Sequence, residues 1–298
     1  MKTIQKLAFF CALALLGFQC QNKQGKVEPH PQKREGKSTT YLDELLQSLP
    51  ANARARGAVS VVERGNAAFL FKYQEGAFTA YIQAVNLKEA KLDFVYQGGP
   101  ASPNNLAPHF ERRSVRQWWN YYAPTHPKVF CVTNGAFFDF RLPRIPFPIK
   151  HNGVIVNAGL GNGESFAKLK LGINGSEAFI YPYENTQNNY GLVAANLLSP
   201  DVIVGLHPEA NKGKYFPTGR TFIGIRDIDG DAKNEWLFIA CSAKAKQAEM
   251  DELLRNVFAS NKTIMFDGSG SSQLYCKGTT YVPGDGRRFR HAFAVLDE

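Results

Sequence analysis

The sequence predicts an α+β protein, a single domain with a mixed, mostly antiparallel β-sheet core and a few packed helices. From residue 59 onward the chain is a succession of short apolar runs separated by Gly, Asn, Asp and Pro, which is typical of strands joined by turns. Only three segments show helical spacing, and no period of 20–50 residues repeats. Because no linker-like segment interrupts residues 40–298, we expect one domain there.

The first twenty residues predict a lipoprotein signal peptide. Lys2 and Lys6 precede an apolar run over residues 7–18, which is too short to span a bilayer of about 30 Å. The run ends at Cys20, the expected site of lipidation, although Gln19 departs from the small residue usual there. The alternative is an ordinary signal peptide with an incidental cysteine. We expect an exported protein anchored to a bacterial membrane, on the periplasmic or the cell-surface face.

Residues 21–39 predict a disordered linker, since they are rich in Lys, Gln, Pro and Gly and almost lack large apolar side chains. Residues 1–56 carry nine Lys or Arg against four Asp or Glu, so they hold +5 of the net charge of +9. A basic tether beside an anionic membrane surface explains this charge. Nucleic acid is therefore not predicted as a partner.

Three cysteines, Cys131, Cys241 and Cys276, remain after the signal, each in an apolar, strand-like context. Three buried free thiols are the first interpretation, and one disulfide with one free thiol is the second. No Cys-x-x-Cys pair indicates zinc or redox chemistry.

Three segments predict helices. Residues 40–49 place leucines at i, i+3, i+4 and i+7 after Thr40, and Pro50 ends that helix. Residues 114–122 predict a weaker helix, and residues 244–259 a strong one with a narrow apolar stripe. The predicted strands cover residues 67–73, 78–86, 92–96, 129–133, 154–156, 178–181, 222–225, 236–241, 263–266, 273–276 and 293–296.

Four glycine-rich polar segments are candidates for chemistry. Thr133–Asp139 follows a predicted strand and offers Asn134 and Asp139 beside two phenylalanines; an Asn-Gly hairpin turn is the alternative. Thr218–Thr221 places Arg220 and Thr221 at a strand start, where a guanidinium fork suits phosphate and a surface arginine is the alternative.

The third segment is the most informative, because an apolar strand delivers Asp267 directly into a Gly-Ser loop. Backbone amides of such a loop, with the hydroxyls of Ser271 and Ser272, suit an anion. A flexible hairpin is the alternative. In the fourth segment, Gly286–Ala292, three arginines and His291 suit an anion, against a solvated strand entry.

An acidic segment, Asp227-x-Asp229-Gly230-Asp231, resembles a calcium loop. Its glycine falls too early for an EF-hand, and no bidentate Glu follows at the required place. We interpret this segment as a hairpin turn.

The ordered motifs Thr-Asn-Gly-Ala-Phe-Phe-Asp, Gly-Arg-Thr-Phe-Ile-Gly-Ile and Phe-Asp-Gly-Ser-Gly-Ser-Ser, with a terminal Arg-rich strand, resemble the phosphodiester glycosidase family over residues 65–298. The resemblance implies hydrolysis of a sugar-1-phosphodiester to a free sugar and a phosphomonoester. Ala136 and Ser269 replace glycines of the family pattern, so both loops are slightly bulkier and the substrate can differ from that of other family members. The resemblance implies catalytic roles for Asp267, Asp139 and Asn134, and phosphate binding by Arg220, Thr221, Gly268, Ser271, Ser272 and Arg287.

The chemistry fits these residue types, because an arginine neutralises a phosphodiester and a carboxylate drives attack at the sugar. Asp267 is the first choice for that carboxylate and Asp139 the second, and we expect both to converge on one pocket with Arg220. No cofactor or metal ligand set is predicted, and a need for a divalent cation stays open. The expected partners are a phosphorylated carbohydrate or glycan and, through the anchor, the membrane.

Two other functions compete with this one. The same pocket would serve a non-catalytic surface lipoprotein that binds phosphorylated or anionic glycans. A phosphodiesterase that cleaves the P–O bond usually needs clustered metal ligands, whereas the six histidines of this chain are scattered.

Overall fold

The computed structural model describes residues 35–51, 58–99, 109–141, 143–159, 168–183 and 199–298. The predicted signal peptide, Cys20 and most of the predicted linker lie outside these residues. The linker prediction is wrong at its end, because residues 35–39 belong to the first helix, α1 (Glu35–Ser48). That helix therefore begins five residues before the predicted start at Thr40.

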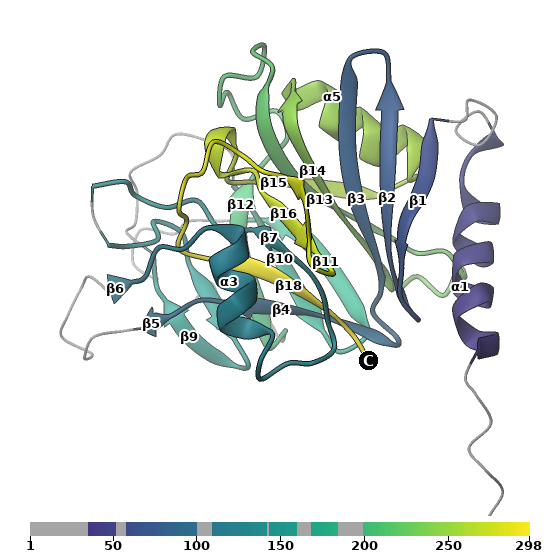
Figure 1. Ribbon diagram of the computed structural model, residues 1–298, viewed down its shortest axis with the longest axis horizontal. Helices are drawn as coiled ribbons and strands as arrows, with labels where there is room; N and C mark the ends of the chain where they lie inside the picture. The colour runs from purple at the N-terminus through teal and green to yellow at the C-terminus, as the bar shows by residue number, and fades with distance from the viewer. Residues whose placement is uncertain (1–34, 52–57, 100–108, 142, 160–167, 184–198) are drawn as a thin grey trace, which may run out of the picture. The chain divides into compact units, whose positions relative to one another are not determined.

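The larger of two main sheets has eleven strands, and its pairings between the described strands are antiparallel. The order along the sheet is β1-β2-β3-β14-β13-β15-β12-β10-β11 (Figure 1). In addition, β8 pairs with β12, and β9 pairs with β8. The strands are β1 (Val59–Arg64), β2 (Ala68–Glu75), β3 (Phe78–Asn86), β8 (Ile149–His151), β9 (Val154–Asn157), β10 (Lys168–Asn174), β11 (Glu177–Pro182), β12 (Asp201–Leu206), β13 (Thr218–Arg226), β14 (Trp236–Ala245) and β15 (Lys262–Phe266).

The second sheet has five antiparallel strands in the order β17-β16-β7-β18-β4. A short ribbon of β5 and β6 stands apart. The strands are β4 (Ala90–Val95), β5 (Gly98–Gly99), β6 (His109–Phe110), β7 (Val129–Asn134), β16 (Leu274–Cys276), β17 (Thr279–Val282) and β18 (Ala292–Asp297).

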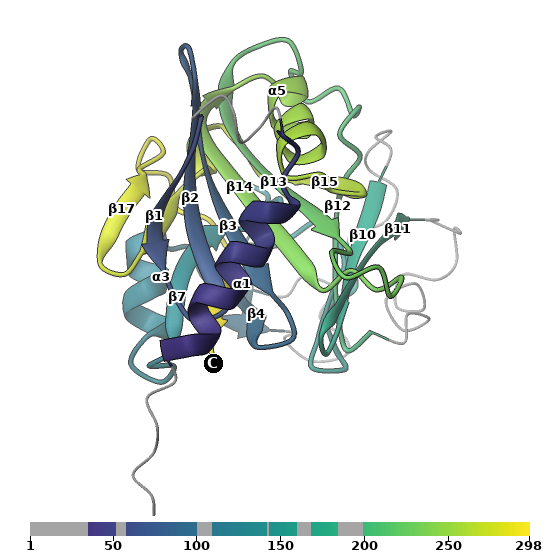
Figure 2. The ribbon, with the colours of Figure 1, turned by 90° about the vertical axis from the view of Figure 1, so that its right-hand side faces the viewer.

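The two sheets pack face to face, and helices cover their outer faces. Side chains of alternating direction along β13 show this arrangement: Ile223 joins the core between the sheets, whereas Phe222 joins the core under the helices. Helices α1 and α5 (Gln247–Glu252, continued by a π-helical turn at Leu253–Val257) cover the large sheet, and α3 (Val115–Tyr122) covers the small one. Figure 2 shows α1 running across the outer side of β1–β3.

The predicted fold class is confirmed, and so are the helices expected near residues 114–122 and 244–259. A capping box between Ser114 and Gln117 starts α3. Three of the longer strands, β1, β10 and β12, were not predicted, although the alternation of lysines with apolar residues in β10 and the short apolar run of β12 are ordinary strand signals. Within the described residues no helix has the length and apolar character needed to cross a membrane.

A disulfide joins Cys131 of β7 to Cys276 of β16, and Cys241 is a buried free thiol. The prediction of three free thiols is therefore wrong, and the second interpretation is confirmed. The two half-cystines lie directly opposite each other in register, 145 residues apart in sequence. Their strand neighbours alone did not reveal the pairing, because Cys241 has the same apolar context. Burial raises the pKa of the Cys241 thiol to about 12, so it stays protonated and unreactive.

We expect the disulfide to stabilise the domain by about 2–5 kcal/mol, since it closes a long loop in the unfolded chain. The Cys131→Ala/Cys276→Ala variant should unfold at a lower denaturant concentration than the wild type. A reductant should lower the melting temperature of the wild type and of a Cys241→Ala control, but not that of the double variant. Equal sensitivity of all three proteins to the reductant would contradict this prediction.

Candidate active site

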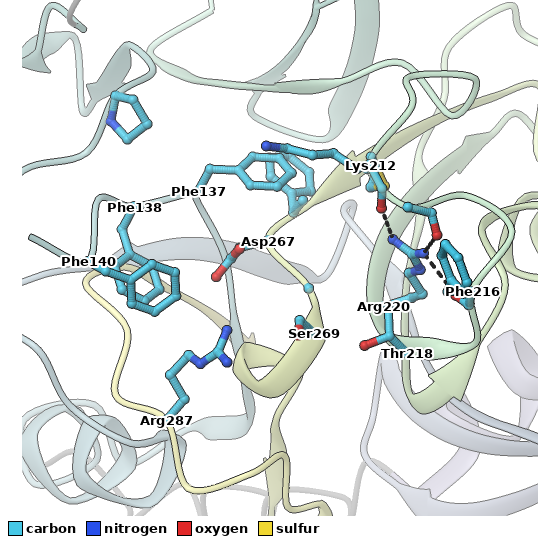
Figure 3. Close-up of a pocket in the computed structure, with 15 residues that line it drawn as sticks. Phe137, Phe138, Phe140, Lys212, Phe216, Thr218, Arg220, Asp267, Ser269 and Arg287 are labelled. Carbon is cyan, nitrogen blue, oxygen red and sulfur yellow. Dashed lines mark hydrogen bonds between the residues drawn. The ribbon is translucent and has the colours of Figure 1, made fainter. Parts of the chain in front are cut away.

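A cavity of about 460 Å³ opens where β13 and β15 meet the loops that follow β7 and β15. Asp267, at the end of β15, and Arg287, before β18, line it, and so do Arg220 and Lys212 (Figure 3). The remaining walls are largely aromatic. The lining residues are Phe137, Phe138, Phe140, Pro146, Lys212, Gly213, Phe216, Thr218, Arg220, Met265, Phe266, Asp267, Gly268, Ser269 and Arg287.

Asp267 is the carboxylate of this cavity. It is partly exposed, but its Oδ2 atom is buried and makes no hydrogen bond. Burial raises the pKa of Asp267 to about 7, and the Ser271 side chain, the Gly268 amide and the positive charges of Arg287 and Lys212 oppose this rise only in part. A carboxyl group with this pKa exchanges a proton near neutral pH, which suits general acid or base chemistry.

Two glycines bring the loop after Asp267 against the start of β13. A Cβ atom at Gly219 would lie 1.9 Å from the carbonyl oxygen of Ser269, and one at Gly268 would lie 2.7 Å from the carbonyl oxygen of Gly219. Backbone therefore meets backbone here, a contact that any side chain would block. This close approach explains the glycines that the sequence places in both segments.

Asn134, predicted as a catalytic residue, lies buried behind the cavity and holds its parts together. Its Nδ2 donates to the carbonyl oxygen of Asp267 (2.7 Å). Its Oδ1 accepts from the Thr221 hydroxyl (2.9 Å) and the Gln273 amide (3.1 Å). One side chain thus ties the end of β7 to β13 and to both ends of the Gly-Ser loop, and it does not line the cavity.

Arg220 differs from its predicted role, because its guanidinium already serves backbone carbonyls. It donates to the carbonyl oxygens of Lys212 (3.0 Å) and Gly213 (2.7 Å) and, more distantly, to those of Phe216 (3.2 Å) and Ala245 (3.3 Å). Figure 3 shows these donors turned toward residues 212–216 rather than toward Asp267. Arg220 therefore positions this loop, and the loop supplies Lys212 and Phe216 to the cavity.

Two cations that line the cavity interact with the charge of Asp267: Arg287, which was predicted, and Lys212, which was not. Arg287 pairs with Asp285 (3.1 Å), lies over the ring of Phe140 (4.9 Å), and points toward Asp267 in Figure 3. The Lys212 ammonium lies 5.9 Å from the ring of Phe137. The sequence signal that was missed is Lys212-Gly213-Lys214-Tyr215-Phe216, which alternates positive charge with glycine and ends in two aromatic residues.

The aromatic walls expose unusual amounts of apolar surface. Phe216 is 72% exposed and Phe140 is 55% exposed at the cavity rim, and neighbouring Tyr215 is 72% exposed. Exposed aromatic rings beside a polar cleft mark a binding surface more often than an accident of folding.

The other predicted site residues lie outside the cavity. Thr221, Ser271 and Ser272 are fully buried behind it, where the Thr221 hydroxyl bonds to Asn134. Asp139 is not among the lining residues. Its carboxylate accepts from the Arg141 amide (2.8 Å) and lies 3.8 Å from Arg144 Nε. The expectation that Asp139 joins Asp267 and Arg220 in one pocket is therefore wrong for Asp139.

His291 supports the turn that leads from β7 into the cavity wall. Its Nδ1 accepts from the Ala136 amide (3.2 Å), and its carbonyl oxygen accepts from the Gly135 amide (2.9 Å). Burial lowers the pKa of His291 to about 3, so the ring is neutral and its Nδ1 stays an acceptor. The carbonyl oxygen of Gly135 in turn accepts from the Asp267 amide (3.1 Å). His291 is thus a packing residue and not an anion ligand.

We expect Asn134→Ala to destabilise the domain by about 3 kcal/mol, because it removes three buried hydrogen bonds of about 1 kcal/mol each. Denaturant unfolding measures this loss. The exposed Asn120→Ala on α3 is the control and should change the unfolding free energy by no more than about 0.5 kcal/mol. Equal effects of the two substitutions would show that Asn134 is not a structural tie.

The raised pKa of Asp267 predicts how stability depends on pH. Between pH 3.8 and about 7 the folded protein holds a proton that the unfolded chain has released, so the unfolding free energy falls as the pH rises through this range. Asp267→Asn lacks this contribution. The difference in unfolding free energy, wild type minus variant, should decline from pH 4 to pH 7 and then level off. A difference independent of pH would contradict the raised pKa.

Comparisons with known proteins agree with the motif resemblance. A model of the phosphodiester glycosidase family matches residues 128–296. No curated protein sequence matches the chain. A hypothetical protein from Synechocystis superposes with a TM-score of 0.53 at 10% identity, covering 80% of this chain and 64% of the length of that one.

The zebrafish N-acetylglucosamine-1-phosphodiester alpha-N-acetylglucosaminidase catalytic domain, auto-inhibited by its pro-peptide, superposes with a TM-score of 0.50. Its sequence is 15% identical, and the match covers 80% of this chain and 82% of that one. At such identities the superpositions show a shared fold alone. The family model, however, spans more than half of the chain and contains β7, β13, β15 and the Gly-Ser loop. This chain belongs to the phosphodiester glycosidase family.

Proposed function

We propose that this protein is a hydrolase that cleaves the glycosidic C–O bond of a sugar-1-phosphodiester. Asp267 is the main support for this proposal, because its carboxyl group has a pKa of about 7 and lines an aromatic-walled cavity together with Arg287 and Lys212. The family match supports the reaction class.

The charges in the cavity suit a phosphodiester. The substrate carries one negative charge. Lys212 and Arg287, the latter also paired with Asp285, supply positive charge beside a carboxyl group that is half ionised near pH 7. Binding the phosphate stabilises the monoester that leaves when the C–O bond breaks. Arg220 contributes indirectly, because its four hydrogen bonds to carbonyl oxygens hold the loop that carries Lys212.

Ionised Asp267 drives the attack at the anomeric carbon in this proposal. The bond between that carbon and the phosphate oxygen breaks, and the phosphomonoester leaves with the bonding electrons. The hydroxyl of water ends on the sugar, and the remaining proton of that water passes to Asp267 or to the released phosphomonoester. Phosphate is a good leaving group, so one carboxylate suffices and no second acid is required. This assignment agrees with the position of Asp139 outside the cavity.

The aromatic rim is the proposed sugar subsite. Phe140 and Phe216 offer exposed rings at the edge of the cavity, and Phe137 and Phe138 line it more deeply. Flat apolar rings can cover the C–H face of a pyranose while its hydroxyls face polar groups. The sugar would then lie between the rim and Asp267, with the phosphate toward Arg287.

We also propose that the protein is exported and anchored to a bacterial membrane through lipid on Cys20. The signal-like pattern of residues 1–20 supports this proposal. The Cys131–Cys276 disulfide supports export as well, since such bonds persist in oxidising compartments. The catalytic domain would then act on a phosphorylated carbohydrate or glycan close to that membrane.

Asp267→Asn should lower kcat on an aryl sugar-1-phosphodiester by about 10²–10⁴-fold, because it removes the carboxylate that drives the attack. Release of the free sugar from a panel of such diesters measures the rate. Asp139→Asn is the matched control, with the same change of charge outside the cavity, and should keep its rate within about threefold of the wild type.

Three results would overturn the proposed function. Wild-type rates in Asp267→Asn would remove this residue from the mechanism. Hydrolysis in ¹⁸O-labelled water should place the label on the sugar, and label on the phosphate would instead show P–O cleavage. Tight binding of the whole diester panel without turnover would identify a glycan-binding lipoprotein.

A further inference from the structure

Four acidic side chains gather in the loop between β13 and β14, at the end of the hairpin away from the cavity. Asp227, Asp229, Asp231 and Glu235 each offer a carboxylate oxygen, and these four oxygens lie within 4.8 Å of one another. Arg220, near the cavity end of β13, is six residues from Arg226, so the loop lies about 20 Å from the cavity along the strand.

Glu235 is the observation that points to a ligand. The residue is 2% exposed, directly before β14. Its Oε1 accepts from the Ile228 amide (3.0 Å), whereas its Oε2 is buried and has no hydrogen-bond partner. A buried carboxylate oxygen without a partner is costly unless a cation satisfies it.

The charge of the cluster is also incompletely balanced. Lys88 forms an ion pair with Asp229. Among the described residues, no other Lys or Arg forms an ion pair with one of these four carboxylates. Four ionised carboxylates outnumber the positive charges of Lys88 and of Arg226, whose guanidinium interacts with the charge of Glu235, so a net negative charge is left. Like charges this close repel one another, and a bound divalent cation would remove most of that repulsion.

The backbone arranges the loop without consuming its ligand capacity. Asp227 accepts from the amides of Gly230 (2.7 Å) and Ala232 (2.8 Å), and Asp231 accepts from the amide of Lys233 (2.9 Å). An ionised carboxylate has about four acceptor positions, so each still has lone pairs for a metal. The amide bonds limit the rotation of these side chains, and this pre-organises the oxygens.

We propose that Asp227, Asp229, Asp231 and Glu235 bind a calcium ion. The four ligands are hard oxygen donors at the first, third, fifth and ninth positions of a nine-residue loop, and Ca²⁺ accepts such a flexible set of six to eight oxygens. The hairpin predicted from the sequence is present, and in this proposal its loop also binds calcium. In an EF-hand loop the bidentate Glu is the twelfth residue, whereas Glu235 is the ninth residue counted from Asp227. The EF-hand spacing therefore does not detect this carboxylate.

Terbium luminescence tests this site, because Tb³⁺ replaces Ca²⁺ and the indole of Trp236 follows Glu235 directly. The full-length chain is treated with EDTA, titrated with Tb³⁺ and excited at the tryptophan band. We expect sensitised emission that saturates at one ion per chain and that excess Ca²⁺ displaces more strongly than Mg²⁺. Emission that Ca²⁺ does not displace would overturn the assignment.

Charge-neutral variants locate the binding. Asp229→Asn/Asp231→Asn should weaken Ca²⁺ binding, measured by calorimetry, at least about tenfold, whereas the exposed Asp43→Asn on α1 should leave it unchanged. If the double variant does not fold, Asp231→Asn alone is tested, because the Asp231 carboxylate accepts its hydrogen bond from the amide of Lys233, two residues away. Unchanged affinity in the variants, or no Ca²⁺ binding by the wild type up to about 10 mM, would overturn the proposal.

Discussion

The hydrogen bonds of Asn134 join the parts of the molecule on which the candidate active site depends. Asn134 ends β7 in the small sheet, and its side chain reaches Thr221 in the large sheet and both ends of the loop from Asp267 to Gln273. Neither sheet alone contains the cavity, since Asp267 comes from the large sheet and Arg287 precedes the last strand of the small one. The buried amide therefore sets how the two sheets meet at this point.

The surrounding contacts add rigidity to that junction. Gly219 and Gly268 let two backbones touch, and neutral His291 holds the turn whose Gly135 carbonyl receives the Asp267 amide. The Cys131–Cys276 disulfide links β7 to β16, the strand that follows the Gly-Ser loop. Asp267 is thus held by covalent and hydrogen-bonded neighbours on several sides. Such support is what a carboxyl group needs to keep a raised pKa, because a mobile side chain would turn toward water.

Arg220 has a different role from the phosphate ligand that its sequence motif suggests. Its guanidinium donates hydrogen bonds to carbonyl oxygens of residues 212–216, and this loop brings Lys212 and Phe216 to the cavity. Because Arg220 binds backbone carbonyl oxygens, it does not depend on which side chains this loop carries.

The sequence by itself determined the fold class, most strands and two of the three helices closely, because period-2 and period-3.6 patterns reflect which face of an element is buried. It also singled out Asp267, Gly268 and Arg287, since a carboxylate after an apolar strand and a Gly-Ser loop are local signals. Four features emerged from the fold alone: Arg220 faces carbonyl oxygens, Asp139 lies outside the cavity, Cys131 pairs with Cys276, and Lys212 lines the site. These outcomes depend on contacts between residues far apart in the chain, and local residue patterns carry no information on which distant partner a side chain meets.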